Sequence, residues 1–249
     1  MITLTPTATE LVAAVGAGAT LVGVDDFSTY PPEVADLPRV GSFLSPNLEA
    51  ILRLRPQLVI ADDVHADLEA SLRDAGIATL QCDMHGLDDV RRGLVAVGER
   101  LDRADAARAA VVRIDAAVDA AATRRHGAPP RVLLVIDREV GGLGNMVAAG
   151  TGSWLDDLVA LLGASNVLSA SGVRYPKISP EEILRAAPDV IIDASYVADP
   201  ARVAADWADV ASVPAVAAGR VVVLHEPYFL APSPRVDLAL ERLAAALYP

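Results

Sequence analysis

The sequence has one cysteine and fewer basic than acidic residues, with 21 Lys and Arg against 33 Asp and Glu. A single cysteine excludes an intrachain disulfide bond, and because free cysteines are usually small core residues, we predict that Cys82 is buried. The formal net charge of −12 is spread along the 249 residues rather than gathered in a tail. Since an acidic surface repels phosphate backbones, this charge argues against nucleic acid as a partner.

Long apolar runs are also absent. No run approaches the roughly 18 to 20 residues of a transmembrane helix, and the start of the chain, Met1–Leu4, is typical of a strand rather than of a signal peptide. We therefore expect either a cytosolic protein or one whose targeting segment has been removed. Hydrophobic residues still make up 53% of the chain, which is enough for a substantial core.

Catalytic motifs are the third absence. The chain has no Walker loop, no paired-cysteine zinc motif and no nucleophile elbow. The glycine-rich segment Gly141–Gly144 follows a predicted strand, but it lacks the dinucleotide-binding spacing and precedes no predicted helix. We therefore assign no catalytic residue, and we expect the protein not to be an enzyme.

A short pattern occurs twice, at positions 132 residues apart. The first copy, F-L-S-P-N-L-E-A-I-L-R-L-R-P-Q-L-V-I, covers 43–60, and the second, Y-P-K-I-S-P-E-E-I-L-R-A-A-P-D-V-I-I, covers 175–192. Each copy combines an aromatic residue, a short helix followed by a proline, and an apolar run that is typical of a buried strand. A repeat of this kind predicts two equivalent lobes.

Each copy carries signals for the start of its helix. Asn47 and Ser179 are predicted to be the capping residues, which accept a hydrogen bond from a free amide of the first turn. Glu49 and Glu181 then occupy the second helical position, where the helix dipole favours a carboxylate. Such a glutamate needs no partner on its own chain, so it is available for contacts with another protein.

Predicted strands and helices alternate along the chain, which is typical of an α/β fold with mainly parallel strands. Near the N-terminus, a capping box at Thr7–Glu10 predicts a helix from Ala8 to Val15. Between Leu87 and Arg125 there is no proline, alanine is abundant and a mostly apolar stripe continues, which predicts one long helix. A second α/β series is predicted to start at Arg131.

We therefore predict an α/β protein of two Rossmann-like lobes with mainly parallel sheets, joined by one long interlobe α-helix. The N-terminal lobe is expected to cover 1–86, the connecting helix 87–126 and the C-terminal lobe 127–249. In open parallel sheets, ligands bind beyond the carboxyl ends of the strands. The loops that follow strands are therefore where we expect the binding site.

Many of the few aromatic residues fall in loops before or after predicted strands. The chain has only two tryptophans, five tyrosines and three phenylalanines. The rings in these loops are Phe27, Tyr30, Phe43, Tyr175, Tyr196, Tyr228 and Phe229. Exposed rings offer a large apolar contact area, so the set favours a flat apolar ligand. The alternative is that each ring packs against its own loop.

Three histidines also follow predicted strands: His65, His85 and His225. Imidazole is a common metal ligand, so these residues could converge on a metal ion or on a metal-bearing ligand. The commoner situation is a solvated loop histidine, and no metal ligand is assigned.

Several segments resemble a known family. They run from T-P-T-A-T-E-L at 5–11, through V-G-V-D-D-F-S-T-Y-P-P at 22–32 and N-L-E at 47–49, to P-K-I-S at 176–179 and S-P-R at 233–235. The chain is similar to the class III periplasmic substrate-binding proteins, which have a single long interlobe helix and serve ABC importers of cobalamin, haem and ferric siderophores. The Y-P-P and N-L-E matches resemble the cobalamin-binding branch.

The resemblance implies two groups of functional residues. Phe27, Phe43 and Tyr175 would line a ligand cleft, and Glu49 and Glu181 would be acidic knobs that pair with arginines of the two permease halves. The full set of candidate ligand contacts is Thr7, Phe27, Phe43, Asp62, Tyr175, Tyr228 and Phe229. Two departures are visible: Asp62 replaces an aromatic residue, and the segment 226–231 lacks an acid and an arginine that the cobalamin branch has.

The resemblance also implies a function. We expect a substrate-binding protein of an ABC importer, which binds cobalamin or a related corrinoid between its lobes and delivers it to a permease dimer. A haem or a ferric siderophore is the alternative ligand, and a metal-ion binding protein or a chelatase-like enzyme is a further alternative. We expect no cofactor, and we expect the protein to be a monomer. The expected location is periplasmic or anchored at the cell surface, with the signal segment absent from this chain.

Overall fold

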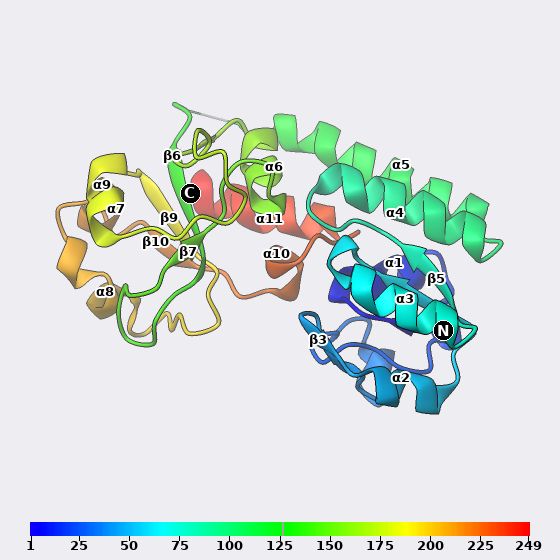
Figure 1. Cartoon of the computed structure of the whole chain (residues 1–249). Helices are drawn as coiled ribbons and strands as arrows, with labels where there is room; N and C mark the ends of the chain where they lie inside the picture. Colours follow the sequence, from blue (N-terminus) through cyan, green and yellow to red (C-terminus); the bar gives the residue numbers. More distant parts are fainter. Residues whose placement is uncertain (126) are drawn as a thin grey trace. The chain divides into compact units, whose positions relative to one another are not determined.

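The computed structural model describes residues 1–125 and 127–249, which divide into two compact units (Figure 1). Unit 1 consists of 1–115 together with 231–234, and unit 2 consists of 116–230 together with 235–249. Both units combine parallel strands with helices, so the predicted α/β class is confirmed. The division after Asp115 falls inside a helix, and the predicted limits at 86 and 126 stay a prediction.

Unit 1 is built on a three-stranded parallel sheet in the order β1-β4-β5. The strands are β1 (Ile2–Thr3), β4 (Leu58–Ala61) and β5 (Ala78–Gln81). Every residue of the central strand β4 is buried, as expected for a parallel strand covered on both faces. Core residues from β1, β4 and the surrounding helices form one cluster, which includes Ile2, Val59, Ile51 and Leu72.

The remaining elements of unit 1 precede or follow these strands. They are α1 (Pro6–Ala14), η1 (Gly18–Thr20), η2 (Pro32–Val34), β2 (Gly41–Ser42), β3 (Ser45–Pro46), α2 (Leu48–Leu54), η3 (Asp63–His65), α3 (Ala66–Asp74) and α4 (Leu87–Arg100). The capping residue of α1 is Thr5, whose side chain accepts from the amide of Ala8 at 3.0 Å. The predicted cap at Thr7 is wrong, because Pro6 fits the first helical position and starts the helix earlier.

The predicted single helix over 87–126 is also wrong. The chain forms α4 and then α5 (Ala104–Ala122), and Asp102 between them adopts a left-handed conformation with φ of 55°. The two helices lie side by side in the green part of Figure 1. A Cβ atom added to Gly98 of α4 would lie 2.4 Å from the Cβ of Ala107 of α5, so the backbones approach closely at this point.

The two helices run antiparallel. Besides the contact near their junction, Arg91 of α4 forms an ion pair with Asp115 of α5 at 2.9 Å. The division between the two units falls within α5, directly after Asp115. Residue 126, the last of the predicted connecting helix, lies outside the described residues. Among the described residues, no helix has the length and apolarity that crossing a membrane requires.

Unit 2 contains a five-stranded sheet in the order β10-β9-β6-β7, with β8 also paired to β6. The strands are β6 (Arg131–Asp137), β7 (Val147–Ala148), β8 (Ser165–Asn166), β9 (Val190–Asp193) and β10 (Val221–Val223). All pairs are parallel except that between β6 and β7. The helices are α6 (Trp154–Leu161), α7 (Pro180–Ala186), α8 (Val203–Asp206), η4 (Ala208–Val210), α9 (Pro214–Ala217), α10 (Pro227–Leu230) and α11 (Val236–Leu247).

The repeat in the sequence corresponds to a repeat in the structure. α2 followed by β4 in unit 1 matches α7 followed by β9 in unit 2. Asn47 caps α2 and Ser179 caps α7, as predicted. Both helices end in a residue with left-handed conformation that is not glycine, Arg55 with φ of 47° and Ala187 with φ of 43°, and these residues are also 132 positions apart.

The segment 231–234 belongs to unit 1 although it lies late in the sequence. The chain leaves unit 2 after Leu230, contributes these four residues to unit 1 and returns to unit 2 at Arg235. Ser233 is buried there and donates from Oγ to the Oε2 atom of Glu10 in α1 at 2.5 Å. Unit 1 is therefore completed by a segment that follows most of unit 2 in the chain.

Candidate functional site

The loop that contains Asp25 and Ser28 exposes Phe27 to solvent. The side chain of Asp25 is buried and accepts hydrogen bonds from the amide of Phe27 at 2.9 Å and from the hydroxyl of Ser28. Arg39 holds the same loop by donating to the carbonyl oxygens of Asp25 at 2.9 Å and Ser28 at 2.7 Å. Burial raises the pKa of Asp25. Phe27 is 53% exposed, and the buried side chains of Asp25 and Ser28 hold its loop in place.

Phe43 lies at the tip of the β2–β3 hairpin, where it contacts His65. The two rings meet edge to face with centroids 5.5 Å apart. His65 accepts from the amide of Asp62 through Nδ1 at 3.0 Å, so Nε2 carries the hydrogen and donates to the carbonyl of Phe43 at 2.8 Å. Both ring nitrogens are thus engaged and the residue is buried. His65 is a structural residue that supports Phe43, and both of its ring nitrogens are occupied by hydrogen bonds within the protein.

Asp62, Asp63 and His85 form a compact polar cluster at the carboxyl end of β4. One oxygen or nitrogen of each lies within 4.8 Å of the others, and Nε2 of His85 is 3.3 Å from Oδ2 of Asp63. Burial, and then the hydrogen bond and charge of Asp63, raise the pKa of Asp62 to about 7. Two carboxylates and an imidazole could hold a divalent cation. Asp62, predicted as a ligand contact, is buried within this cluster and accepts from the amide of Val64.

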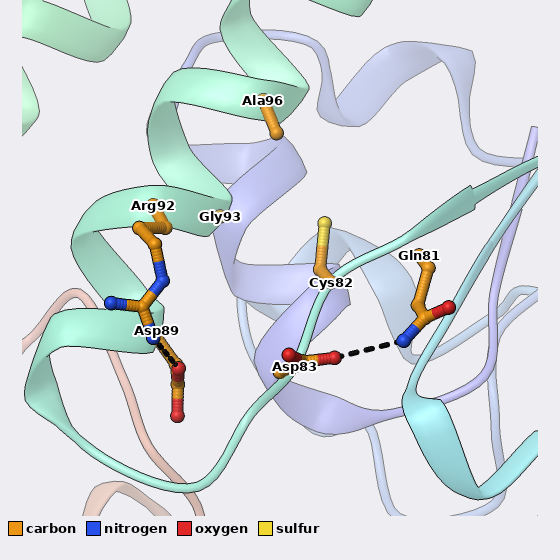
Figure 2. A pocket seen from close by; sticks show the side chains of 7 residues that line it. All are labelled: Gln81, Cys82, Asp83, Asp89, Arg92, Gly93 and Ala96. Carbon is orange, nitrogen blue, oxygen red and sulfur yellow. Dashed lines mark hydrogen bonds and ion pairs between the residues drawn. The ribbon is translucent and has the colours of Figure 1, made fainter.

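A pocket of about 240 Å³ lies on unit 1 between the end of β5 and α4 (Figure 2). Its lining residues are Gln81, Cys82, Asp83, Asp89, Arg92, Gly93 and Ala96. Figure 2 shows that the polar side chains pair with one another: Arg92 with Asp89, and Gln81 with Asp83 at 3.0 Å. Cys82 is buried, as predicted, and burial raises the pKa of its thiol to about 12. The thiol is therefore protonated at neutral pH and is a poor nucleophile.

The candidate ligand contacts of unit 2 differ in their exposure. Tyr175 is 43% exposed, in the loop before the repeated helix α7. Tyr228 is half-buried, its ring lying 5.3 Å from that of Phe229 and 5.1 Å from the guanidinium carbon of Arg235. Phe229 itself is fully buried in α10. The ring of Phe229 packs in the core, and its predicted ligand contact stays a prediction.

Two other predicted residues have positions that decide their role. Thr7 is buried within α1, and its predicted ligand contact stays a prediction. His225 is exposed after β10. Of the predicted ligand contacts, Phe27 and Phe43 belong to unit 1, and Tyr175 and Tyr228 to unit 2; these four retain an accessible ring.

Unit 2 contains a buried ionic network that the sequence did not predict. Arg138, directly after β6, donates to Asp193 at 2.7 Å and to Asp206 at 3.0 Å. The indole of Trp207 also donates to Asp193, at 3.1 Å. All of these side chains are buried. The sequence places charged residues at the ends of the apolar strands β6 and β9, a pattern that is equally typical of an exposed loop.

The two glutamates of the repeat are exposed on their helices, as predicted. Glu49 forms an ion pair with Arg53 one turn later at 2.9 Å. Glu181 is fully exposed, and hydrogen bonding by its own amide and by Ser179 lowers its pKa. Both carboxylates are the second residue of their helix, α2 and α7. Each unit thus presents one carboxylate at an equivalent place.

Comparison with known proteins gives consistent results over the whole chain. The model of the periplasmic binding protein family matches residues 1–228. A vitamin B12-binding protein of Salmonella typhimurium is 31% identical over 252 residues, covering 99% of this chain and 89% of that protein.

Solved structures agree with this match. A periplasmic haem-binding protein of Roseiflexus sp. RS-1 in its apo form has a TM-score of 0.84 and 28% identity, covering 99% of this chain and 97% of that one. The periplasmic vitamin B12-binding protein of Vibrio cholerae has a TM-score of 0.82 and 27% identity, covering 99% and 95%. Together with the family match, these similarities show that the chain belongs to the periplasmic binding protein family.

Proposed function

We propose that this chain is the substrate-binding protein of an ABC importer, and that it binds cobalamin or a related corrinoid. The observation that carries the proposal is the exposed ring of Phe27 on a loop fixed by buried Asp25 and by Arg39. A ring that is held in place while exposed offers apolar contact area with little loss of freedom on binding. Phe43, supported by His65, provides a second ring on the same unit.

Unit 2 contributes Tyr175, and with it Tyr228, whose ring is half-buried. Aromatic faces suit the flat macrocycle of a corrinoid, and phenol hydroxyls can bind its polar substituents. The similarity to vitamin B12-binding proteins over 99% of the chain supports this choice of ligand. Asp62 is not a substitute for a third ring, because its side chain is occupied in the cluster with Asp63 and His85.

The proposal is for binding and not for catalysis. In the described part of the chain, the pocket of Figure 2 has paired polar groups and a protonated thiol, which is no nucleophile–base arrangement. We propose that the ligand is a cargo that leaves unchanged. We propose a periplasmic or surface-anchored location, which follows from the family, and a monomer that meets its permease through Glu49 and Glu181.

Calorimetric titration with hydroxocobalamin, haemin and a ferric siderophore tests the ligand. We expect saturable one-to-one binding of hydroxocobalamin and much weaker heats from the other two. Binding of none of the three would contradict the receptor proposal. Tight binding of the siderophore alone would show that the ligand is a siderophore and not a corrinoid.

Haem is a second candidate, favoured by the solved haem-binding relatives and by the exposed Tyr30, Tyr175 and Tyr196 and His225. Phenolate and imidazole both serve as axial ligands of haem iron. Titration with haemin would then produce a shifted Soret band. Substitution of the coordinating tyrosine or histidine should abolish that shift. A protein that binds cobalamin and not haem would leave the spectrum of haemin unchanged.

A further inference from the structure

The polar cluster of Asp62, Asp63 and His85 combines side chains from the ends of two neighbouring strands. Asp62 and Asp63 directly follow β4, and His85 lies in the loop between β5 and α4. The two strands are parallel, with Ala61 opposite Gln81, so both segments leave the sheet at its carboxyl edge. The sheet therefore brings the imidazole to the two carboxylates, although 22 residues separate Asp63 from His85 in the chain.

The spacing of the donor atoms in this cluster suits a metal ion. Nε2 of His85 lies 3.3 Å from Oδ2 of Asp63. Neighbouring ligands of a tetrahedral zinc ion, each about 2.0 to 2.2 Å from the metal, are separated by about 3.3 to 3.6 Å. All three donor atoms lie within 4.8 Å of one another, and Asp63 is exposed and His85 half-buried. Small rotations of these two side chains would therefore place all three donors around one ion.

Asp62 is a buried carboxylate with little compensation from the protein. It is 2% exposed, and its backbone donor is the amide of Val64 at 3.5 Å, the outer limit of a hydrogen bond. In the part of the chain that the structure describes, no lysine or arginine forms an ion pair with it. Its side chain faces the carboxylate of Asp63 instead. Because an uncompensated buried carboxylate is costly and two facing carboxylates repel, a cation between them would stabilise both.

Hydrogen bonds hold the backbone on both sides of the cluster. The amide of Asp62 donates to Nδ1 of His65 at 3.0 Å, and the amide of His85 donates to Oδ2 of Asp89 at 3.0 Å. The same oxygen of Asp89 accepts from the amide of Gly86 at 3.0 Å. The segments that carry the three side chains are thus fixed before any ion binds, which lowers the cost of ordering them on binding.

We propose that Asp62, Asp63 and His85 form a binding site for a divalent first-row transition metal ion such as zinc. One imidazole nitrogen and two carboxylate oxygens suit such an ion, whereas calcium and magnesium prefer oxygen ligands alone. Three protein ligands leave a coordination position for water or for a donor group of another molecule. The site is independent of the proposed cargo, because the candidate rings for a corrinoid are not among its ligands.

Calorimetric titration of the full chain with zinc chloride, after treatment with EDTA and dialysis, tests this site without any cobalamin present. We expect one-to-one binding of zinc, weaker binding of calcium, and a melting temperature that rises with the zinc concentration. Asp63→Asn and His85→Gln should each weaken zinc binding by about tenfold or more, since even groups behind metal ligands contribute about 10- to 100-fold in affinity. Asp63 is exposed, so Asp63→Asn should melt like the unmodified chain in EDTA and decides the test even if His85→Gln is less stable.

The matched controls are Asp67→Asn in α3 and His225→Gln after β10, which remove an exposed carboxylate and an exposed imidazole outside the cluster. Both should bind zinc as the unmodified chain does. Absence of zinc binding, or full zinc affinity in Asp63→Asn, would overturn the proposal. Weak binding of several zinc ions that the cluster variants do not change would show adventitious binding to an acidic surface and would also overturn it. Tighter binding of calcium than of zinc would overturn the choice of a transition metal.

Discussion

At the scale of single residues, the contact most open to test is the ring of Phe27. It is exposed, and the loop below it is held by Asp25 and Arg39. Phe27→Ala removes the ring without removing a hydrogen bond, so we expect the affinity for hydroxocobalamin to fall by about tenfold or more with an unchanged melting temperature. Calorimetric titration measures the affinity, and thermal unfolding measures the melting temperature. Val140→Ala, at a site 75% exposed on unit 2, is the control for loss of an exposed apolar side chain.

A second prediction concerns Asp62 and pH. Its pKa, raised to about 7 from 3.8 by burial and by Asp63, means that the folded protein holds this proton more tightly than the unfolded chain does. The free energy of unfolding should therefore decrease as the pH rises from about 4 to about 7 and level off above that. Asp63 titrates below 3.8, because its pKa is lowered, so it acts outside this window.

Asp62→Asn removes the ionisation but can still accept from the amide of Val64. A shift of about three pKa units, at about 1.4 kcal/mol each, sets an upper bound of about 4 kcal/mol. Since solvent screens part of this interaction, we expect the free energy of unfolding of the variant at pH 8 to exceed that of the unmodified chain by on the order of 2 kcal/mol. Urea unfolding in EDTA at pH 5 and pH 8 measures the difference, with exposed Asp67→Asn as control. An unaltered pH dependence in the Asp62 variant would contradict the prediction.

At the scale of elements, the close approach of α4 and α5 depends on Gly98. A methyl group there would lie 2.4 Å from the Cβ of Ala107, so the two helices would have to move apart. We expect Gly98→Ala to lower the free energy of unfolding by about 1 to 3 kcal/mol, as overpacking does. Gly142→Ala is the matched control, because a Cβ there meets nothing within 4 Å. Equal stability of the two variants in urea unfolding would show that the helices are not closely packed.

The strand ends of unit 2 depend on Arg138. Arg138→Met would leave the buried carboxylates of Asp193 and Asp206 without the guanidinium that joins them. Breaking a buried ion pair from one side typically costs about 3 to 5 kcal/mol, and we expect a loss of that size in denaturant unfolding. Arg202→Met is the control, because Arg202 is exposed and its ion pair with Asp206 is long, at 3.9 Å. A loss no larger than that of the control would place the network among the weak surface pairs.

At the scale of the whole molecule, ligand binding and delivery should be separable. Glu49→Lys/Glu181→Lys reverses the charge at two exposed positions, each on a repeated helix. We expect calorimetry to give an unchanged affinity for hydroxocobalamin, while uptake of labelled cobalamin by proteoliposomes that contain the permease is lost. The variant Glu33→Lys, which reverses an exposed charge in η2, should transport normally. Loss of ligand affinity in the double variant would contradict the docking role of the glutamates.

Much of this organisation could be predicted from the sequence because the repeat encodes it locally. The caps Asn47 and Ser179 and the helix-start glutamates depend only on neighbouring residues, and the structure has all of them at the predicted places. The break at Asp102 could not be predicted in the same way. Its neighbours are good helix formers, and no local pattern reveals the left-handed conformation of Asp102 or the close packing of Gly98 against Ala107.

The candidate site was predicted less well than the fold. Loop positions indicated which rings follow strands, but whether a ring is exposed depends on packing across the unit. Phe27 lies in a polar loop and is 53% exposed, whereas Phe229 lies in α10 and is fully buried. The contact of His65 with Phe43 depends on a hairpin 22 residues earlier, whereas its hydrogen bond with the amide of Asp62 is local.

The segment 231–234 sets a limit on how this protein can be dissected. Unit 1 needs Ser233, whose hydroxyl reaches the buried Glu10, and the chain arrives at Ser233 only after passing through most of unit 2. A fragment that stops in α5 would contain the whole sheet of unit 1 but not this closing piece. Separate expression of the two halves therefore requires a fusion, in which a linker joins residues 231–234 to the end of the first half.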